Sequence, residues 1–270
     1  MGKRWPAVDV TLGAHDDSLD LLLADADDYS PTAVEEHDGV LRIFFPTTEL
    51  RDRAAEALRG TPVDVDDEDW AKRAQPIAPI TVGRITVVPS LQSPVSSPDT
   101  IAIVIPPSMG FGTGHHSTTR LCLAALQSID LRGKFVLDVG TGSGLLAIAA
   151  AKLGAARAVG TDDDADAIQA ARENLDFNGV TNVEFVVSDL MKEPLPVADV
   201  VLANITGAML IRAAGHLLKA VRPGGVLILS GILASEGDEV RRAFANLTVI
   251  ADVQEDEWVG ITLRTVVGDQ

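Results

Sequence analysis

The chain has 270 residues and a hydrophobic fraction of 46%, enough for one large domain or for a domain with a small appendage. It carries 39 acidic against 22 basic side chains, a formal net charge of −17, and no basic stripe, which argues against direct nucleic-acid binding. The single cysteine, Cys122, excludes a disulfide framework and a cysteine-rich metal site. Its apolar helical surroundings predict a buried side chain.

The acidic charge leaves two interpretations open, solubility alone or attraction to a basic protein partner. No apolar run approaches the length of a membrane span, and the first residues lack the apolar core of a secretion signal. We therefore expect a cytoplasmic protein with no membrane contact. The sequence does not define the oligomeric state, for which we expect a monomer.

The first sixty residues predict a small α+β domain. The expected order is strand, helix, strand, strand, helix, which suggests a ferredoxin-like module that recognises substrate. A linker is expected over 61–105, where the acidic run DVDDED (64–69) predicts a solvated loop or a helix start. Within that linker, ITVGRITVV (80–88) predicts one or two strands. The clearest elements are VDVTL and VLRIFF as strands, with SLDLLLADA and TTELRDRAAEALRG as helices.

From residue 106 to 270 the pattern predicts one larger domain. Near-continuous apolar strands alternate with helices, which indicates a doubly wound, mostly parallel sheet. The last two strands follow one another closely, so the sheet should end in an antiparallel hairpin. We expect seven strands, in KFVLDVG, AARAVGTD, NVEFVV, ADVVLANI, GVLILSG, LTVIADVQ and EWVGITLRTVV.

A glycine cluster, DVGTGSG (138–144), follows the first strand of this sheet. Ligands bind at the carboxyl ends of strands in open α/β folds, where glycines let the backbone approach closely. A dinucleotide fingerprint needs a third glycine where Leu145 stands. The spacing is instead G-x-G-x-G with Asp138 two residues ahead. This pattern, with the terminal hairpin, is typical of class I S-adenosylmethionine methyltransferases; a purely structural turn remains the alternative.

Polar residues also follow three further strands. Asp162 ends the second strand, where an acid accepts hydrogen bonds from ribose hydroxyls; its alternative role as a helix N-cap can be filled by Asp163 or Asp164. Asp189 follows the third strand and could help to hold the adenine, or be a loop acid. Asn204 ends the fourth strand, where its amide can both accept from and donate to an amine. We expect Gly140, Gly142 and these three residues to form one cofactor site.

Two adjacent histidines, His115 and His116, lie in the loop ahead of the glycine cluster. Neighbouring residues of an extended loop point apart and no further ligand is near in sequence, so we expect no metal. Either histidine could serve as a base or contact substrate, and plain loop polarity is an equal alternative.

Several longer stretches together resemble the PrmA-type ribosomal protein methyltransferases. They are PPSMGFGTGHHSTTRLCL, VLDVGTGSGLLAIAAAKLGA, VGTDDDADAIQAARENLDFNGV, VVLANI and RPGGVLILSGIL, covering roughly the last two-thirds of the chain. Departures include His115 for a usual threonine and Ser117 for a usual proline. In the linker only Trp70 remains of the family's aromatic residues.

The resemblance implies a Rossmann-like, S-adenosylmethionine-dependent enzyme that methylates lysines and the N-terminal amine of large-subunit ribosomal protein eleven. It also implies that Thr119 contacts the cofactor, together with Gly140, Asp162 and Asn204. Asn204 is our candidate catalytic residue, because its amide could orient the amine. Three alternatives stay open: another basic protein or a small molecule as acceptor, a nicotinamide-dependent dehydrogenase, and a cofactor-binding scaffold without turnover.

Overall fold

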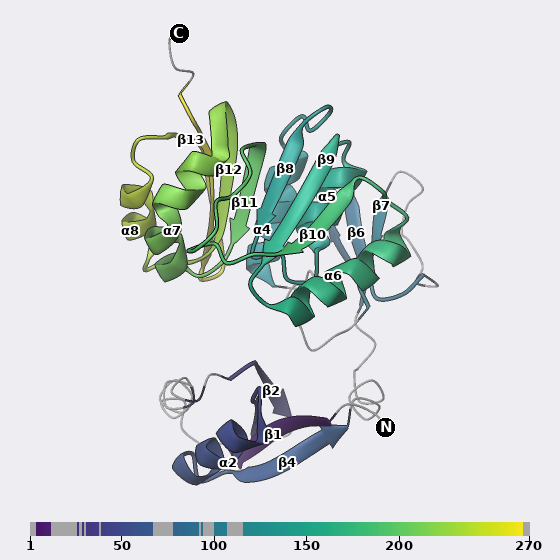
Figure 1. Ribbon diagram of the computed structural model, residues 1–270, viewed down its shortest axis with the longest axis vertical. Helices are drawn as coiled ribbons and strands as arrows, with labels where there is room; N and C mark the ends of the chain where they lie inside the picture. The colour runs from purple at the N-terminus through teal and green to yellow at the C-terminus, as the bar shows by residue number, and fades with distance from the viewer. Residues whose placement is uncertain are drawn as a thin grey trace. The chain divides into compact units, whose positions relative to one another are not determined.

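The computed structural model describes residues 4–11, 26, 29, 31–37, 39–66, 78–91, 93, 100–106 and 116–266. The chain forms two compact units, residues 1–77 and residues 78–270 (Figure 1). Among the described residues the first unit has one β-sheet and one buried apolar cluster, and the second has two of each.

The first unit contains an antiparallel sheet in the order β2-β3-β1-β4 and helix α2. The predicted strands in VDVTL and VLRIFF and the helix after Thr47 are confirmed. The Thr47 hydroxyl caps α2 by accepting from the backbone N–H of Leu50 at 3.2 Å. The elements are β1 (Arg4–Thr11), β2 (Ala33–His37), β3 (Val40–Phe44), α2 (Thr48–Ala57) and β4 (Thr61–Asp66).

The acidic run 64–69 was expected to be a loop or a helix start, and that expectation is wrong for its first three residues. Asp64, Val65 and Asp66 lie in β4, which pairs with β1. The alternation explains why, since Val65 is buried while Asp64 faces outward to an ion pair with Arg51. Residues 61–66 therefore belong to the sheet of the first unit rather than to a linker.

The ferredoxin-like assignment of this unit remains a proposal. The order of the four strands supports it. The expected first helix, over 18–26, lies outside the described residues except for Ala26, which is helical and buried.

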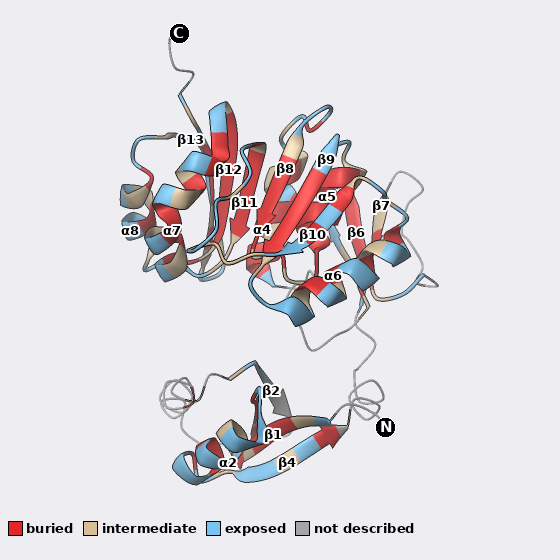
Figure 2. Ribbon diagram, viewed as in Figure 1, coloured by how far each residue is buried: buried red, intermediate tan, exposed pale blue. Residues whose placement is uncertain are grey.

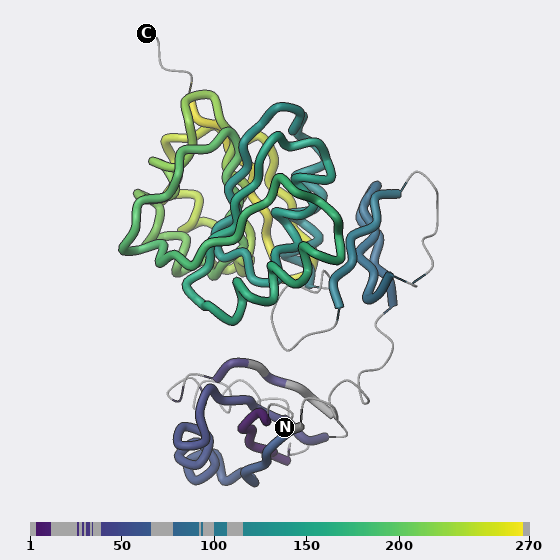
Figure 3. The backbone as a smooth tube through the Cα atoms, turned by 45° about the vertical axis from the view of Figure 1, so that its right-hand side comes forward, coloured from purple at the N-terminus to yellow at the C-terminus, as the bar shows by residue number. Residues whose placement is uncertain are grey.

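A small three-stranded sheet opens the second unit, within the stretch that we expected to be a linker. ITVGRITVV forms two strands, β5 (Ile80–Val82) and β6 (Ile85–Val88), joined at Gly83 with φ +56°. Strand β7 (Ile101–Val104), which was not predicted, pairs with β6 in parallel. Residues of β6 and β7 are buried in the same cluster as the helices over 117–127, 145–152 and 165–178, and Figure 3 shows the segment beside the larger body of this unit.

The large sheet of the second unit confirms the predicted fold class. Its seven strands run in the order β10-β9-β8-β11-β12-β14-β13, and only β14 is antiparallel to the strands on both sides. Helices α4, α5 and α6 contribute to the core on one face, and α7 and α8 to the core on the other. The elements are α4 (Ser117–Gln127), β8 (Phe135–Val139), α5 (Leu145–Lys152), β9 (Arg157–Asp162), α6 (Ala165–Asn178), β10 (Val183–Val187), β11 (Ala198–Asn204), α7 (Gly207–Ala220), β12 (Val221–Leu233), α8 (Gly237–Ala243), β13 (Thr248–Glu255) and β14 (Trp258–Arg264).

Burial follows the pattern that the sequence predicted. Helix α5 is apolar on every side, and its residues 145–151 are all buried (Figure 2). Cys122 is fully buried in the same cluster, as expected, and burial raises the pKa of its thiol. Within the described part of the chain, no helix is long and apolar enough to cross a membrane.

Candidate functional site

Four parallel strands end at one edge of the large sheet, and the predicted site residues follow them. Strand β8 lies between β9 and β11, so its carboxyl end is the point where the strand order reverses. Val139 is level with Thr161 of β9 and with Ala203 of β11. Gly140, Asp162 and Asn204 therefore stand at the ends of three neighbouring strands.

The loop from Gly140 to Gly144, here called the glycine loop, needs its glycines. Gly140, Gly142 and Gly144 have φ of +70°, +51° and +79°, the left-handed region that other residues adopt at a cost. A Cβ on Gly144 would lie 2.5 Å from the Phe185 ring, and one on Gly140 would lie 2.5 Å from Ile205. The loop is thus held close to Ile205 and Phe185, with no room for a Cβ at Gly140 or Gly144.

Asp162 ties the glycine loop to the adjacent strand. Its Oδ2 accepts from the Gly142 N–H at 2.9 Å and its Oδ1 accepts from the Asp164 N–H at 3.1 Å. The side-chain cap of α6 is Asp164, which accepts from Asp166 at 2.8 Å, so Asp162 is not needed as a cap. A carboxylate has about four lone-pair sites, so Asp162 keeps capacity for two hydroxyl donors.

Asn204 and Thr119 lie on the same side of the sheet. Val200 and Leu202 of β11 are buried in the cluster that includes α4 and α5, and Asn204 continues that alternation. Helix α4 packs against β11, β12 and β14 on this face. Among the described residues the Asn204 side chain has no hydrogen-bond partner, which leaves its amide available for a ligand.

Thr119 does not cap α4. The cap is His116, whose Nδ1 accepts from the Thr118 N–H at 3.4 Å and is 2.8 Å from the Thr118 hydroxyl. The His116 ring also packs edge-on against Trp258 at the start of β14, with ring centroids 4.7 Å apart. Thr119 is buried in the first turn, with 4% of its surface exposed.

Ser117 links the start of α4 to the end of the sheet. Its hydroxyl donates to Asp256 at 3.2 Å and accepts from Arg120 at 2.7 Å. Arg120 in turn forms an ion pair with Glu255. The turn between β13 and β14 therefore holds the helix start that carries Thr119.

The Asp189 carboxylate contacts residues of its own loop. Its Oδ1 accepts from the Met191 N–H at 2.8 Å, and its Oδ2 is 2.7 Å from the Lys192 ammonium. Lys192 lowers the pKa of this carboxyl, with the backbone hydrogen bonds adding to the effect. These contacts support the loop-acid interpretation more than direct adenine binding.

Asp138 was noted in the motif but was not expected to be a site residue. It is fully buried, with Oδ2 accepting from the Thr141 hydroxyl at 2.6 Å and Oδ1 lacking a partner among the described residues. Burial raises its pKa to about 6, and the charge of Asp162 adds to the rise. The D-x-G spacing was the signal available in the sequence, but it did not show where the carboxyl points.

Asn174 was also missed. It is buried on α6, and its Nδ2 donates to the Ser143 carbonyl of the glycine loop at 2.9 Å. It lies three residues after Ala171, on the face that the periodicity predicted to be apolar. A polar side chain on an apolar helix face was the signal that could have found it.

Only one histidine of the pair falls within the described part of the chain. His115 lies outside the described residues, and His116 is used as the helix cap. Among the residues described, no three His, Cys, Asp or Glu side chains are grouped to hold a metal ion.

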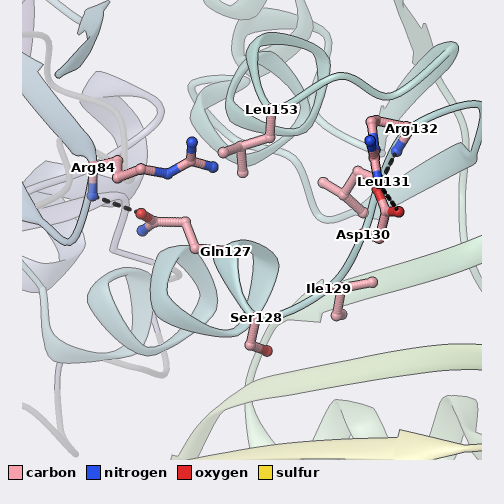
Figure 4. Close-up of a pocket in the computed structure, with 8 residues that line it drawn as sticks. All are labelled: Arg84, Gln127, Ser128, Ile129, Asp130, Leu131, Arg132 and Leu153. Carbon is pink, nitrogen blue, oxygen red and sulfur yellow. Dashed lines mark hydrogen bonds and ion pairs between the residues drawn. The ribbon is translucent and has the colours of Figure 1, made fainter. Parts of the chain in front are cut away.

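Two surface pockets lie at the opposite, amino edge of the sheet. Figure 4 shows the first, of about 420 Å³, with Arg84, Gln127 and Leu153 around it. The second, of about 400 Å³, lies beside Asp199 and Arg222. The charges there are largely paired within the protein, as between Arg132 and Asp130 at 2.7 Å. Neither pocket touches a predicted site residue.

The carboxyl edge fits an adenosyl cofactor. Left-handed glycines leave the backbone open to close approach, an adjacent carboxylate can take ribose hydroxyls, and an amide with no partner among the described residues lies on the face of Thr119. The inserted antiparallel β14 differs from a dinucleotide-binding sheet. Fold and site together define a class I S-adenosylmethionine-dependent methyltransferase.

Comparison with known proteins gives the family. A family described as ribosomal protein L11 methyltransferase (PrmA) matches residues 35–265. This chain belongs to that family. A ribosomal protein L11 methyltransferase of Azotobacter vinelandii is 41% identical over 249 residues, covering 87% of this chain and 84% of the relative.

Two further relatives agree. One from Geobacter metallireducens is 48% identical over 196 residues, covering 71% of this chain and 64% of the relative. A crystal structure of a ribosomal protein L11 methylase from Lactobacillus delbrueckii subsp. bulgaricus is 28% identical with a TM-score of 0.64, covering 71% of this chain and all of that one. The alignment with the Geobacter protein thus spans somewhat less than two-thirds of its length.

Proposed function

We propose that this protein transfers methyl groups to amine nitrogens of ribosomal protein L11, on lysine side chains and the N-terminus, in the cytoplasm. Membership of the PrmA family carries the choice of substrate. The net charge of −17 supports a basic protein as partner. We propose further that the first unit recognises that protein and that the enzyme acts as a monomer without contacting nucleic acid.

We propose that Thr119, Gly140, Gly142, Asp162 and Asn204 hold the cofactor. The contact that carries this assignment is the one from Asp162 to the Gly142 N–H, because it fixes a carboxylate beside an open glycine loop. Asp162 would accept from the ribose hydroxyls through its remaining lone pairs. Asp189 has a smaller part in this proposal, since the Lys192 ammonium already pairs with one of its oxygens and the Met191 N–H donates to the other.

S-adenosylmethionine supplies an electrophilic methyl group on a sulfonium sulfur. The N–C bond forms as the S–C bond breaks, so the main task of the protein is alignment. A lysine amine has a pKa of about 10.4, and well under ~1% of it is neutral at pH 7. The site must therefore desolvate the amine or accept its proton. We propose that the Asn204 side-chain oxygen accepts from the amine and orients its lone pair.

Asn204→Ala tests the catalytic assignment. The expected result is a kcat lower by about 100-fold and an affinity for S-adenosylhomocysteine lower by about 3- to 10-fold, because the side chain is proposed to contact both the amine and the cofactor. Asn182→Ala is the matched control, because Asn182 donates to the Ala155 carbonyl at 2.8 Å at the opposite edge of the sheet. Full turnover and full affinity in Asn204→Ala would rule out its role.

The substrate is tested by incubating the protein with purified ribosomal protein L11 and labelled S-adenosylmethionine, then mapping the label by mass spectrometry. We expect label on amines of that protein. A parallel reaction in a cell lysate covers the alternatives. Label on another basic protein or on a small molecule, with none on ribosomal protein L11, would contradict the proposed substrate. Cofactor binding without transfer to any component would indicate a scaffold.

A further inference from the structure

Two buried asparagines of α6, Asn174 and Asn178, connect the glycine loop to strand β7. They lie four residues apart, so both project from one side of the helix. Their exposed fractions are 6% and 8%. A buried amide needs hydrogen-bond partners, and each of these side chains donates to a backbone carbonyl far away in the sequence.

Asn178 binds the edge of β7 in the way that a neighbouring strand would. Its Oδ1 accepts from the Val104 N–H at 2.9 Å, and its Nδ2 donates to the Val104 carbonyl at 2.8 Å. Strand β7 pairs with β6 on its other side only, so the asparagine occupies part of the free edge. The same Nδ2 also donates to the Asn174 carbonyl at 2.7 Å.

Asn174 continues the connection to the cofactor side. Its Nδ2 donates to the carbonyl of Ser143, which lies between Gly142 and Gly144 in the glycine loop. The side-chain amide of Asn174 thus holds the Ser143 carbonyl, and the side-chain amide of Asn178 holds the backbone carbonyl of Asn174. Strand β7, the end of α6 and the glycine loop thus share one buried chain of hydrogen bonds, here called the asparagine relay.

Helix α6 also has packing contacts that do not involve this chain of hydrogen bonds. Helix α6 already packs on the sheet through Ile168 and Ala171, which are fully buried, and it stops at Gly179 with φ +62°. Strand β7 is the last described strand before α4, the helix that carries Thr119. The relay therefore joins the glycine loop to the last described strand before α4.

We propose that the asparagine relay positions the glycine loop for cofactor binding and couples it to β7. The inference rests on the proposed cofactor site. Asn174 acts through Ser143, and Asn178 acts through Asn174, so both are positioning residues. By reciprocity, a cofactor bound at the glycine loop should stabilise the Val104–Asn178 contact.

The variants Asn174→Ala and Asn178→Ala test the relay against Asn182→Ala, which removes a side-chain-to-carbonyl bond outside it. We expect affinity for S-adenosylhomocysteine to fall about 10-fold in Asn174→Ala and about 3- to 10-fold in Asn178→Ala, as for loss of one or two buried hydrogen bonds. Asn182→Ala should stay within about twofold. In the double variant the loss should be smaller than the product of the two single losses.

Melting temperature and kcat at saturating cofactor separate positioning from general stability. Wild-type affinity in both relay variants, or losses in all three variants that simply follow the melting temperature, would overturn the relay. Asn174→Ser and Asn178→Ser are the milder replacements if the alanine variants do not fold.

Amide hydrogen exchange on the wild-type protein needs no variant. Saturating S-adenosylhomocysteine should slow exchange of the Val104 amide by about 10-fold or more, although Val104 is outside the glycine loop. Binding without any change at Val104 would overturn the relay and leave the cofactor site standing. No binding of S-adenosylhomocysteine at all would overturn the cofactor site, and the relay with it.

Discussion

The two edges of the large sheet carry similar residue types and use them differently. At the amino edge, Asp199 accepts from the Phe135 N–H at 2.8 Å and pairs with Arg222 at 2.8 Å, so its charge is balanced within the protein. At the carboxyl edge, Asp162 accepts only backbone N–H groups among the described residues, and Asn204 has no side-chain partner there. Polar side chains whose hydrogen bonds are made within the protein indicate a structural role, and those that can accept or donate further hydrogen bonds indicate the binding site.

The two pockets described above lie away from the predicted site. Both pockets of about 400 Å³ lie at the amino edge, where paired charges line them. The carboxyl edge is recognised instead by backbone conformation, with three left-handed glycines in five residues. The polar groups and backbone conformations at each edge therefore indicate function better than the volumes of these two pockets do.

The largest expected effect comes from replacing one glycine at each edge of the sheet by alanine. Gly144→Ala places a Cβ 2.5 Å from the buried Phe185 ring at φ +79°, whereas Gly133→Ala at φ +72° meets nothing within 4 Å. We expect unfolding free energy to fall by about 2–5 kcal/mol in Gly144→Ala and about 1–2 kcal/mol in Gly133→Ala. Affinity for S-adenosylhomocysteine should fall about 100-fold only in the first. Calorimetric titration and urea unfolding measure both, and equal affinities would break the comparison.

The next largest effect is expected from replacing one aspartate at each edge of the sheet by alanine. Asp162→Ala removes the anchor of the Gly142 N–H and the proposed ribose acceptor, so affinity for S-adenosylhomocysteine should fall about 30- to 150-fold, as for 2–3 kcal/mol. Asp199→Ala should lower the unfolding free energy by about 2 kcal/mol, with affinity within twofold. A loss of affinity in Asp199→Ala as large as in Asp162→Ala would contradict the distinction.

A smaller effect concerns pH and the buried carboxyl at the base of the glycine loop. Burial raises the pKa of Asp138 from 3.8 to about 6, so the folded state favours its protonated form. The stabilisation is complete below pH 3.8 and is lost as pH rises through about 6. The groups that act on this carboxyl are the Thr141 hydroxyl, the Ala147 N–H, Asp162 and, in the neighbouring core, Cys122.

Asp138→Asn carries no titrating proton. Its unfolding free energy relative to wild type should therefore rise by about 1–3 kcal/mol between pH 4 and pH 7.5. Urea unfolding at the two pH values measures the difference. An identical pH dependence in the two proteins would show that the carboxyl titrates near its ordinary value.

The smallest effect is expected at Asp189. Because its oxygens bind the Met191 N–H and Lys192, Asp189→Ala should change affinity for S-adenosylhomocysteine by less than about threefold. Lys192→Ala is the companion variant, and it should behave in the same way. A loss of tenfold or more in Asp189→Ala alone would restore Asp189 as a direct adenine contact.

Short-range patterns determined much of this protein. The spacing of apolar residues predicted the strands and helices of the large sheet, and Asp138, Gly140, Gly142 and Gly144 marked the loop after its first strand. Neighbouring residues along the chain also determine the Asp164 cap and the Asn-Gly stop of α6, and the apolar surface of α5. Such features need few residues to form, so one sequence is enough to find them.

Tertiary structure decided which of the marked residues have partners. Asp189 and Asp162 look alike in sequence. Lys192 pairs with Asp189 from only three residues away, whereas the contact of Asp162 with the Gly142 N–H joins residues twenty apart and depends on the pairing of β8 with β9. Strand β4 was missed because its pairing with β1 joins residues more than fifty apart, and the acidic run concealed the alternation of Val63 and Val65. The partners of Asn174 and Asn178 are likewise distant in sequence. A side-chain contact between distant segments depends on the packing of both, and local periodicity does not encode it.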